Sequence, residues 1–201
     1  MKRLFDILCA ALILMLSAPV MLVIALLIRH HDRGPVFYVA ERMKTPQQPF
    51  HLIKFRTMTH VDAAQNGGVT GGDKSGRITP IGRVLRRFRL DELPQAINVL
   101  RGDMSIVGPR PPLRQYTDAF PELYARVLRS RPGITGLATL HFHRHEERLI
   151  ARATTAAETE AIYTRRCIPR KATLDLIYQR HASVCFDIVI LWQTIARVLG
   201  R

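Results

Sequence analysis

The sequence has few cysteines, and they are not arranged in pairs. Cys9, Cys167 and Cys185 are three in number, and their spacing matches neither a disulfide framework nor a zinc site. Cys9 lies in an apolar run and Cys185 in a helical pattern, so we expect both to be buried as small hydrophobic side chains. This cysteine usage is typical of a protein in a reducing compartment.

Acidic and aromatic residues are also scarce. There are 16 Asp and Glu residues against 30 Lys and Arg residues, which gives a net charge of +14. Such a chain attracts polyanions, namely nucleic acid, anionic lipid head groups or phosphorylated substrates. Aromatic residues make up 7% of the chain and no nucleic-acid-reading motif is visible, which argues against a nucleic-acid-binding protein. A non-catalytic scaffold at a membrane surface remains an alternative, because basic amphipathic helices bind anionic lipid.

The N-terminal segment is the longest apolar run of the sequence. Residues 4–28 contain one charged residue, Asp6, and as a helix they would reach roughly 37 Å, enough to cross a bilayer core. A cleaved signal peptide has a shorter apolar region, of about 7–15 residues, and here apolar residues resume after Pro19. We therefore predict a retained membrane helix and divide the chain into this helix (1–33) and a cytoplasmic domain (34–201).

The flanks of this segment suggest how it enters the membrane. Basic residues stand at both ends, Lys2 and Arg3 at one and Arg29 to Arg33 at the other, whereas a spanning helix has its positive charges mainly on one side. Pro19 removes a backbone hydrogen bond near the middle and predicts a bend, which Ser17 would assist by bonding to a carbonyl. A re-entrant helix that returns to the same face explains these features together; a plain span with a tolerated proline is the alternative.

The remainder predicts an α+β fold, mostly helical with a small β-hairpin. Runs of β-forming residues at 36–40 and 50–55 indicate the hairpin, and the glycine-rich stretch 62–76 indicates a loop, either a substrate lid or a disordered segment. Residues 81–88 indicate a basic helix that Thr79 caps, and residues 91–100 a helix that Asp91 caps. Residues 102–112 indicate an irregular connector. Further helices are expected at 113–130, 146–165 and 183–199, some of them amphipathic and lying on the membrane surface.

The adjacent carboxylates Asp91 and Glu92 are candidates for catalysis. They follow a run of arginines that includes Arg86 and Arg87, and such neighbours would lower the pKa of Asp91 and keep it ionised. An ionised aspartate can attack phosphorus, and a neighbouring carboxylate can help to hold a divalent cation. The alternative for this pair is an N-cap on a solvated helix.

Several basic residues are candidates for binding phosphate. Lys54 and Arg56 alternate along an expected strand and would share one face. Arg110 lies in the rigid segment GPRP, and Arg131 opens the glycine-containing segment RPGITG. In such loops backbone N–H groups and a guanidinium can bind phosphate together.

The run LDELPQAINVLRGDMSIVGPRP, residues 90–111, resembles the core motif of the bacterial sugar transferases, the monotopic phosphoglycosyl transferases. The match is long, and other blocks resemble the family in the same order, so the resemblance covers nearly the whole chain. It is to the small form of the family, without the additional N-terminal helices of larger members. The other matching blocks are KRLFD (2–6), GPVFY (34–38), KFRTM (54–58), RPGITGLA (131–138) and residues 175–194.

The resemblance implies a function, a mechanism and a location. Asp91 would attack the β-phosphate of a UDP-sugar, release UMP and carry the phosphosugar, which then passes to polyprenyl phosphate. Glu92 would assist with Mg²⁺, held by both carboxylates, or with the acceptor. The expected location is the cytoplasmic face of the bacterial inner membrane, with lipid of one leaflet as a partner, no nucleic acid, and self-association left open. The residues expected to bind phosphate or nucleotide are Lys54, Arg56, Arg86, Arg87, Arg110 and Arg131.

Two features depart from the family pattern. The usual Ser-Pro bend is interrupted, because Ala18 stands between Ser17 and Pro19. After RPGITGLA the chain has TLHFHRHEER, in which His141, His143 and His145 alternate. We expect a solvated or sugar-facing loop here, with metal binding by the histidines as the alternative. The identity of the sugar is open.

Overall fold

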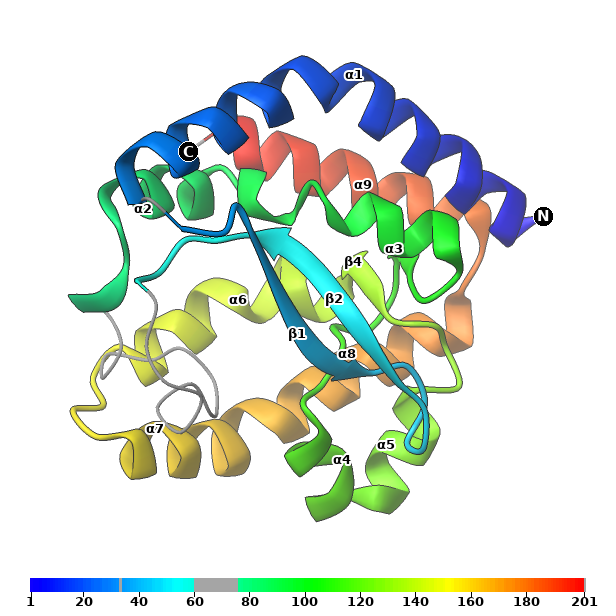
Figure 1. Cartoon of the computed structure of the whole chain (residues 1–201). Coiled ribbons are helices and arrows are strands. Elements are labelled where there is room, and N and C mark those ends of the chain that lie inside the picture. Colours follow the sequence, from blue (N-terminus) through cyan, green and yellow to red (C-terminus); the bar gives the residue numbers. More distant parts are fainter. Residues whose placement is uncertain (33, 60–75, 201) are drawn as a thin grey trace.

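The computed structural model describes residues 1–32, 34–59 and 76–200, and helices make up most of them (Figure 1). The strands are β1 (Phe37–Met43), β2 (Pro49–Phe55), β3 (Ser105–Val107) and β4 (Gly133–Thr135). The helices are α1 (Lys2–Asp32), α2 (Pro80–Arg87), the 3-10 helix η3 (Leu90–Glu92), α3 (Gln95–Arg101), α4 (Arg114–Ala119), α5 (Pro121–Val127), α6 (Leu137–Ile150), α7 (Ala156–Ile162), the π-helix η4 (Tyr163–Cys167), α8 (Ile168–His181) and α9 (Val184–Leu199). The predicted class, mostly helical with a small sheet, is confirmed.

Strands β1 and β2 form the expected hairpin. They are antiparallel, with Tyr38 opposite Lys54 and Phe37 opposite Phe55, and the last two rings stack with centroids 5.4 Å apart. β-Forming residues on both strands favour this pairing. The hairpin places Lys54 one residue before the end of β2, at the edge of the candidate site.

A second, parallel strand pair was not expected from the sequence. Strands β3 and β4 lie in the segments that were predicted to be irregular, and Ser105 pairs with Gly133 and Val107 with Thr135. Gly108, which follows β3, lies so close to Gly133 of β4 that a Cβ on Gly133 would be 2.1 Å from the Gly108 nitrogen. Glycine at both positions therefore allows the GPRP and RPGITG segments to pack against each other.

Local signals located some helices correctly and others incorrectly. Helix α2 begins after Thr79, whose hydroxyl accepts from the Gly82 N–H at 3.0 Å, as predicted. Asp91 is not an N-cap; it lies inside η3, and α3 begins after Pro94. The region 113–130 is two helices, because Pro121 lacks the N–H that a continuous helix needs and starts α5 instead.

The segment with the three histidines is also helical. It belongs to α6, whereas we expected a loop at this position and a helix that begins only at Glu146. Helix α9 agrees with its predicted range, and the Ser183 hydroxyl caps it by accepting from the Phe186 N–H at 3.2 Å. The predicted loop 62–76, with its alternatives of a lid or a disordered segment, lies outside the described residues except for Gly76.

Helix α1 is long, bent and exposed along one apolar face. Figure 1 shows it bending near its middle, where Pro19 lies, and running over the same side of the molecule as α9. The Ser17 hydroxyl bonds to Met21 Sδ at 3.4 Å and not to a carbonyl, so the expected help with the bend is absent. By length and composition α1 is a candidate membrane segment, and only 11% of its most apolar 18-residue stretch is buried against the rest of the protein.

Both halves of α1 pack against the same domain. Near its N-terminus, Ala10 is buried in a core cluster that includes Leu52 and Val99. Near its C-terminus, Ile28 is buried in another cluster with Phe55. The domain thus contacts the helix on both sides of the bend.

The cysteines differ in burial from the expectation. Cys167 is fully buried, Cys9 is half-buried against a core cluster and Cys185 is exposed. The prediction for Cys185 is wrong, because the first turn of α9 directs this position away from the domain.

Candidate active site

Asp91 and Glu92 lie side by side on the wall of a cavity of about 270 Å³. Both belong to η3, a single turn between α2 and α3, and the preceding residue Arg89 adopts the left-handed conformation with φ 56°. The sharp change of direction at Arg89, followed by Pro94 before α3, holds the two carboxylates in a short rigid turn. Their exposed fractions are 7% and 8%.

Glu92 is fixed by two guanidinium groups. Its Oε1 accepts a hydrogen bond from Arg110 Nη1 at 3.1 Å, and its Oε2 accepts one from Arg89. Burial alone would raise the pKa of Glu92, but the charges and hydrogen bonds of Arg89 and Arg110 outweigh it and lower that pKa to about 2. Glu92 is therefore ionised at every physiological pH.

Asp91 is in the opposite situation. Within the described part of the chain, no hydrogen bond or ion pair engages its carboxylate. Burial and the charge of Glu92 raise the pKa of Asp91, and the attraction of Lys54 and Arg86 compensates only in part. The predicted lowering of the Asp91 pKa is therefore wrong, because burial and the negative charge of Glu92 outweigh the attraction of the cations Lys54, Arg86 and Arg89.

Lys54 and Arg86 contribute positive charge on the same side of the cavity. Lys54, in β2, places its ammonium 5.2 Å from the ring centroid of Tyr38, and burial lowers the pKa of Lys54 to about 8 despite the attraction of Asp91. Arg86, in the last turn of α2, donates from Nε to Thr57 Oγ1 at 2.9 Å. With Arg89 and Arg110 they surround the acidic pair with cations.

Three basic residues predicted for the site lie elsewhere. Arg56 follows the end of β2 and is buried beside Gly34, where a Cβ would come within 2.1 Å of its Nη1. Of the two residues expected to share a face, Lys54 lines the cavity and Arg56 does not. Arg87 is exposed over the ring of Phe88, and Arg131 is also exposed. None of the three is among the described residues that line the cavity.

The histidines of α6 do not form a metal site. A helix turns by about 100° per residue, so position 143 points away from positions 141 and 145, which lie one turn apart on the same side. His143 lines the cavity, whereas His141 and His145 are exposed. No group of three potential metal-ligating side chains occurs among the described residues.

Other residues of the cavity were not recognised from the sequence. Arg42 comes from β1, and a second wall, called the far wall here, comes from α4, α5, α6, η4 and α8. Asp175 falls in a block that resembles the family (175–194), but nothing in that block marks it as a cavity residue, and positions such as Tyr124 and Lys171 lie outside the matching blocks. The polar members of the far wall include Tyr124, Glu146, Tyr163, Lys171 and Asp175.

Comparisons with known proteins identify relatives over the whole chain. The family model described as bacterial sugar transferase matches residues 1–201. The chain is 34% identical over 203 residues to the UDP-N-acetylgalactosamine-undecaprenyl-phosphate N-acetylgalactosaminephosphotransferase of Aeromonas hydrophila. It is 38% identical over 207 residues to the undecaprenyl-phosphate glucose phosphotransferase of Komagataeibacter xylinus. It is 33% identical over 211 residues to the exopolysaccharide production protein ExoY of Rhizobium meliloti.

These relatives differ in length. Each alignment covers 98% of the present chain, but it covers 43% of the Aeromonas protein, 35% of the Komagataeibacter protein and 84% of the Rhizobium protein. The chain thus spans less than half of the first two relatives and most of the third.

Proposed function

The chain belongs to the bacterial sugar transferase family, and on this premise we propose that it transfers a sugar-1-phosphate from a UDP-sugar to undecaprenyl phosphate. The products are UMP and undecaprenyl-diphosphate-sugar, from which a bacterial surface glycan is built. The observation that carries the proposal is the pairing of an unengaged buried carboxylate, Asp91, with an arginine-bound one, Glu92, in a cation-lined cavity.

We assign the role of nucleophile to Asp91. Its carboxylate oxygen forms a bond to the β-phosphorus of the donor, the bond from that phosphorus to the bridging oxygen breaks, and UMP leaves with the electron pair. A phosphate oxygen of the acceptor then attacks the same phosphorus and frees the carboxylate. Lys54, Arg86 and Arg89 lie near Asp91 and would neutralise the charge of the transferring phosphate. Glu92 instead orients Arg89 and Arg110, because its oxygens are already engaged.

The arrangement can hold a divalent cation, with the Asp91 carboxylate as its main protein ligand. Magnesium is usually held by one or two carboxylates together with substrate phosphates. Asp91 offers an unengaged carboxylate, while Glu92 has only the lone pairs left by its two arginines. Mg²⁺ held by these two residues and the donor phosphates would supply positive charge to the phosphate oxygens.

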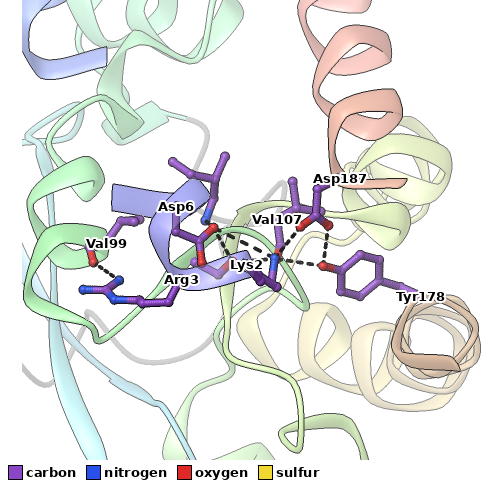
Figure 2. A network of polar contacts seen from close by, with 9 residues as sticks. Lys2, Arg3, Asp6, Val99, Val107, Tyr178 and Asp187 are labelled. Atoms are coloured by element: carbon purple, nitrogen blue, oxygen red, sulfur yellow. Dashed lines mark hydrogen bonds and ion pairs between the residues drawn. The ribbon is translucent and has the colours of Figure 1, made fainter. Parts of the chain in front are cut away.

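We also propose that α1 enters one leaflet and returns. Figure 2 shows the polar network at its N-terminal end. Lys2 Nζ lies 2.6 Å from Asp187 Oδ2 of α9, and Arg3 Nη1 donates to the Val99 carbonyl at 2.6 Å. The buried Asp6 carboxylate accepts from the Ser105 hydroxyl at 2.9 Å.

These contacts favour a re-entrant helix over a spanning one. If α1 crossed the bilayer, its N-terminal end would lie on the other side from the domain that Lys2, Arg3 and Asp6 contact. Its C-terminal half is held by the same domain through Ile28. The bend at Pro19 allows both ends to lie on the cytoplasmic face.

Helix α9 supports the same orientation. It runs under α1 in Figure 1 and exposes Ile188, Val189, Trp192 and Ile195. An exposed apolar stripe on a helix that also has a polar face is typical of binding at the membrane interface. We therefore propose that α9 lies on the bilayer surface beside the point where α1 enters.

Measurement of UMP release tests the activity directly. The purified protein, in vesicles that contain undecaprenyl phosphate and Mg²⁺, is expected to release UMP from at least one UDP-sugar. Without the acceptor, one equivalent of UMP and a protein mass increased by one phosphosugar are expected. UMP release that requires the acceptor, without any mass increase, would argue for direct transfer.

Thiol labelling tests the topology. A cysteine in a short extension before Met1 and a cysteine at His30 are introduced separately into a variant that lacks the three native cysteines. Both are expected to resist an impermeant thiol reagent in intact cells and to react after lysis. Labelling of the N-terminal cysteine in intact cells would show that α1 spans the membrane. Pro19→Leu serves as the comparison and is expected to expose that cysteine in part of the molecules.

A further inference from the structure

A third buried carboxyl group lies in the same cavity as Asp91 and Glu92. Asp175, in α8, is 7% exposed and lines the cavity wall. No hydrogen bond or ion pair links its side chain to any residue of the described ranges 1–32, 34–59 and 76–200. A carboxyl group that is largely removed from water and has no partner is costly for the fold.

The obvious counter-charge for Asp175 is engaged elsewhere. Lys171 lies one turn earlier in α8, but its ammonium pairs with Glu146 at 3.1 Å and with the Tyr163 hydroxyl at 3.0 Å. Burial raises the pKa of Asp175 to about 7, and the attraction of Lys171 offsets this only in part. Packing alone does not explain an aspartate at this position, because the stability of the fold would gain from an apolar residue.

The surroundings of Asp175 are suited to a ligand with hydroxyl groups. Tyr124, from α5, is 8% exposed and lines the same wall, and its hydroxyl makes no hydrogen bond within the described residues. The neighbouring wall is apolar, with Val127, Ile150 and Ala172. A carboxyl and a phenol group on an apolar wall can bind ring hydroxyls while the wall packs against ring carbons.

The position of Asp175 relative to the acidic pair gives the orientation of a ligand. Arg110 pairs with Glu92 at one end of the cavity, and its pKa is raised by Glu92 and further by Glu146. Glu146 in turn pairs with Lys171, one helical turn from Asp175. The cavity therefore runs from the cation-surrounded acidic pair, through Arg110 and Glu146, to Asp175 and Tyr124.

We propose that Asp175 and Tyr124 form the subsite that binds the hydroxyl groups of the donor's transferred sugar. This inference rests on the proposed transferase function, in which the diphosphate of the donor lies beside Asp91. The sugar ring then extends to the far wall, and the configuration of its hydroxyls decides whether they reach Asp175 and Tyr124. The subsite thus selects among UDP-sugars. The ribose of the nucleotide offers similar hydroxyls, so the experiment has to distinguish the two rings.

The test compares donor preference in the full-length chain. UMP release is measured for UDP-glucose, UDP-galactose and their N-acetylamino counterparts, with wild type, Asp175→Leu, Asp175→Asn and Tyr124→Phe. Asp118→Leu is the matched control, because Asp118 is an exposed aspartate on α4. Asp175→Leu is expected to lower kcat/KM for the preferred donor by roughly 10- to 100-fold and to affect the poorest donor little. Tyr124→Phe is expected to give a smaller change in the same direction.

Two further measurements separate the alternatives. The rise in melting temperature that UMP induces is expected to be unchanged in Asp175→Leu; its loss would assign the subsite to the ribose and overturn the proposal. The melting temperature of ligand-free Asp175→Leu and Asp175→Asn is expected to equal or exceed that of wild type. A clear decrease in both would mark Asp175 as a structural residue and equally overturn the proposal.

The activity measurements distinguish failure of the sugar subsite from failure of the transferase function. If wild type releases UMP from none of the UDP-sugars, the transferase function itself fails. If wild type is active and Asp175→Leu and Tyr124→Phe keep its donor preference, only the sugar subsite is rejected.

Discussion

The two ends of the cavity contain buried carboxyl groups with opposite properties. At one end, Arg89 and Arg110 lower the pKa of Glu92 to about 2; at the other, burial without a partner raises the pKa of Asp175 to about 7. Exposed fractions of 8% and 7% are almost equal, so burial alone does not account for the difference. What differs is the set of charges that the fold brings within reach.

The comparison indicates a division of tasks. The end at Glu92 has its charges paired in advance, which suits a site that must hold phosphate oxygens in a fixed geometry. The end at Asp175 leaves polar groups unengaged, which suits a site that a ligand completes. Asp91 combines features of both, because it lies among the cations and is itself unengaged. The following variants test this division.

The largest effect is expected for Asp91→Asn. The amide keeps the shape of the side chain but is not a nucleophile, so UMP release is expected to fall by at least about 10³-fold. The purified variant should show no mass increase with UDP-sugar, while its melting temperature stays close to that of wild type. Robust turnover by Asp91→Asn would show that Asp91 is not the nucleophile.

Glu92→Gln is expected to reduce both stability and activity. It leaves Arg89 and Arg110 without their counter-charge, and breaking a buried ion pair costs about 3–5 kcal/mol of the free energy of unfolding. We expect a value near the lower limit, because the Arg110 side chain is 47% exposed. The matched control is Glu41→Gln, which breaks the exposed pair with Arg114 and should cost less than about 1 kcal/mol.

Chemical denaturation of both variants at pH 7.5 gives these free energies. Equal losses for Glu92→Gln and Glu41→Gln would show that the pairs of Glu92 are no more important for the fold than a surface pair.

The pH dependence of stability tests the far end. Because the pKa of Asp175 is raised in the folded state, its neutral form is favoured there, and wild type loses stability as pH rises from the unfolded pKa, near 4, to about 7. Asp175→Asn removes this loss. The free energy of unfolding of Asp175→Asn, relative to that of wild type, should therefore rise by about 2 kcal/mol between pH 5.5 and pH 8. Denaturation curves at the two pH values measure the difference; a constant difference would mean that Asp175 is not buried unpaired.

The smallest effects are expected for the basic residues that the sequence suggested and the structure places elsewhere. Arg87→Gln and Arg131→Gln change exposed side chains outside the cavity, so kcat/KM should fall by less than about 3-fold. Lys54→Gln and Arg86→Gln change cavity residues that face Asp91 and should cost about 10-fold or more. A similar loss in all four variants would remove the distinction between cavity and surface.

Features that depend on neighbours in sequence were predicted well. The hairpin of β1 and β2, the Thr79 cap of α2 and the Ser183 start of α9 follow from propensities and capping within a few residues. The prediction failed where a single residue changed the pattern. Pro121 divides an expected helix into α4 and α5.

The sequence by itself determined the family, the apolar segment with its bend at Pro19, and the adjacent carboxylates within a long motif. Only the tertiary structure decided which carboxylate is paired with arginines, whether a pKa is raised or lowered, and which residues complete the cavity. The physical reason is that a pKa depends on burial and on charges nearby in space. Glu92 meets Arg110 across the fold, and Asp175 is buried in a cavity that α5, α6 and α8 build together, where Lys171 is already paired with Glu146.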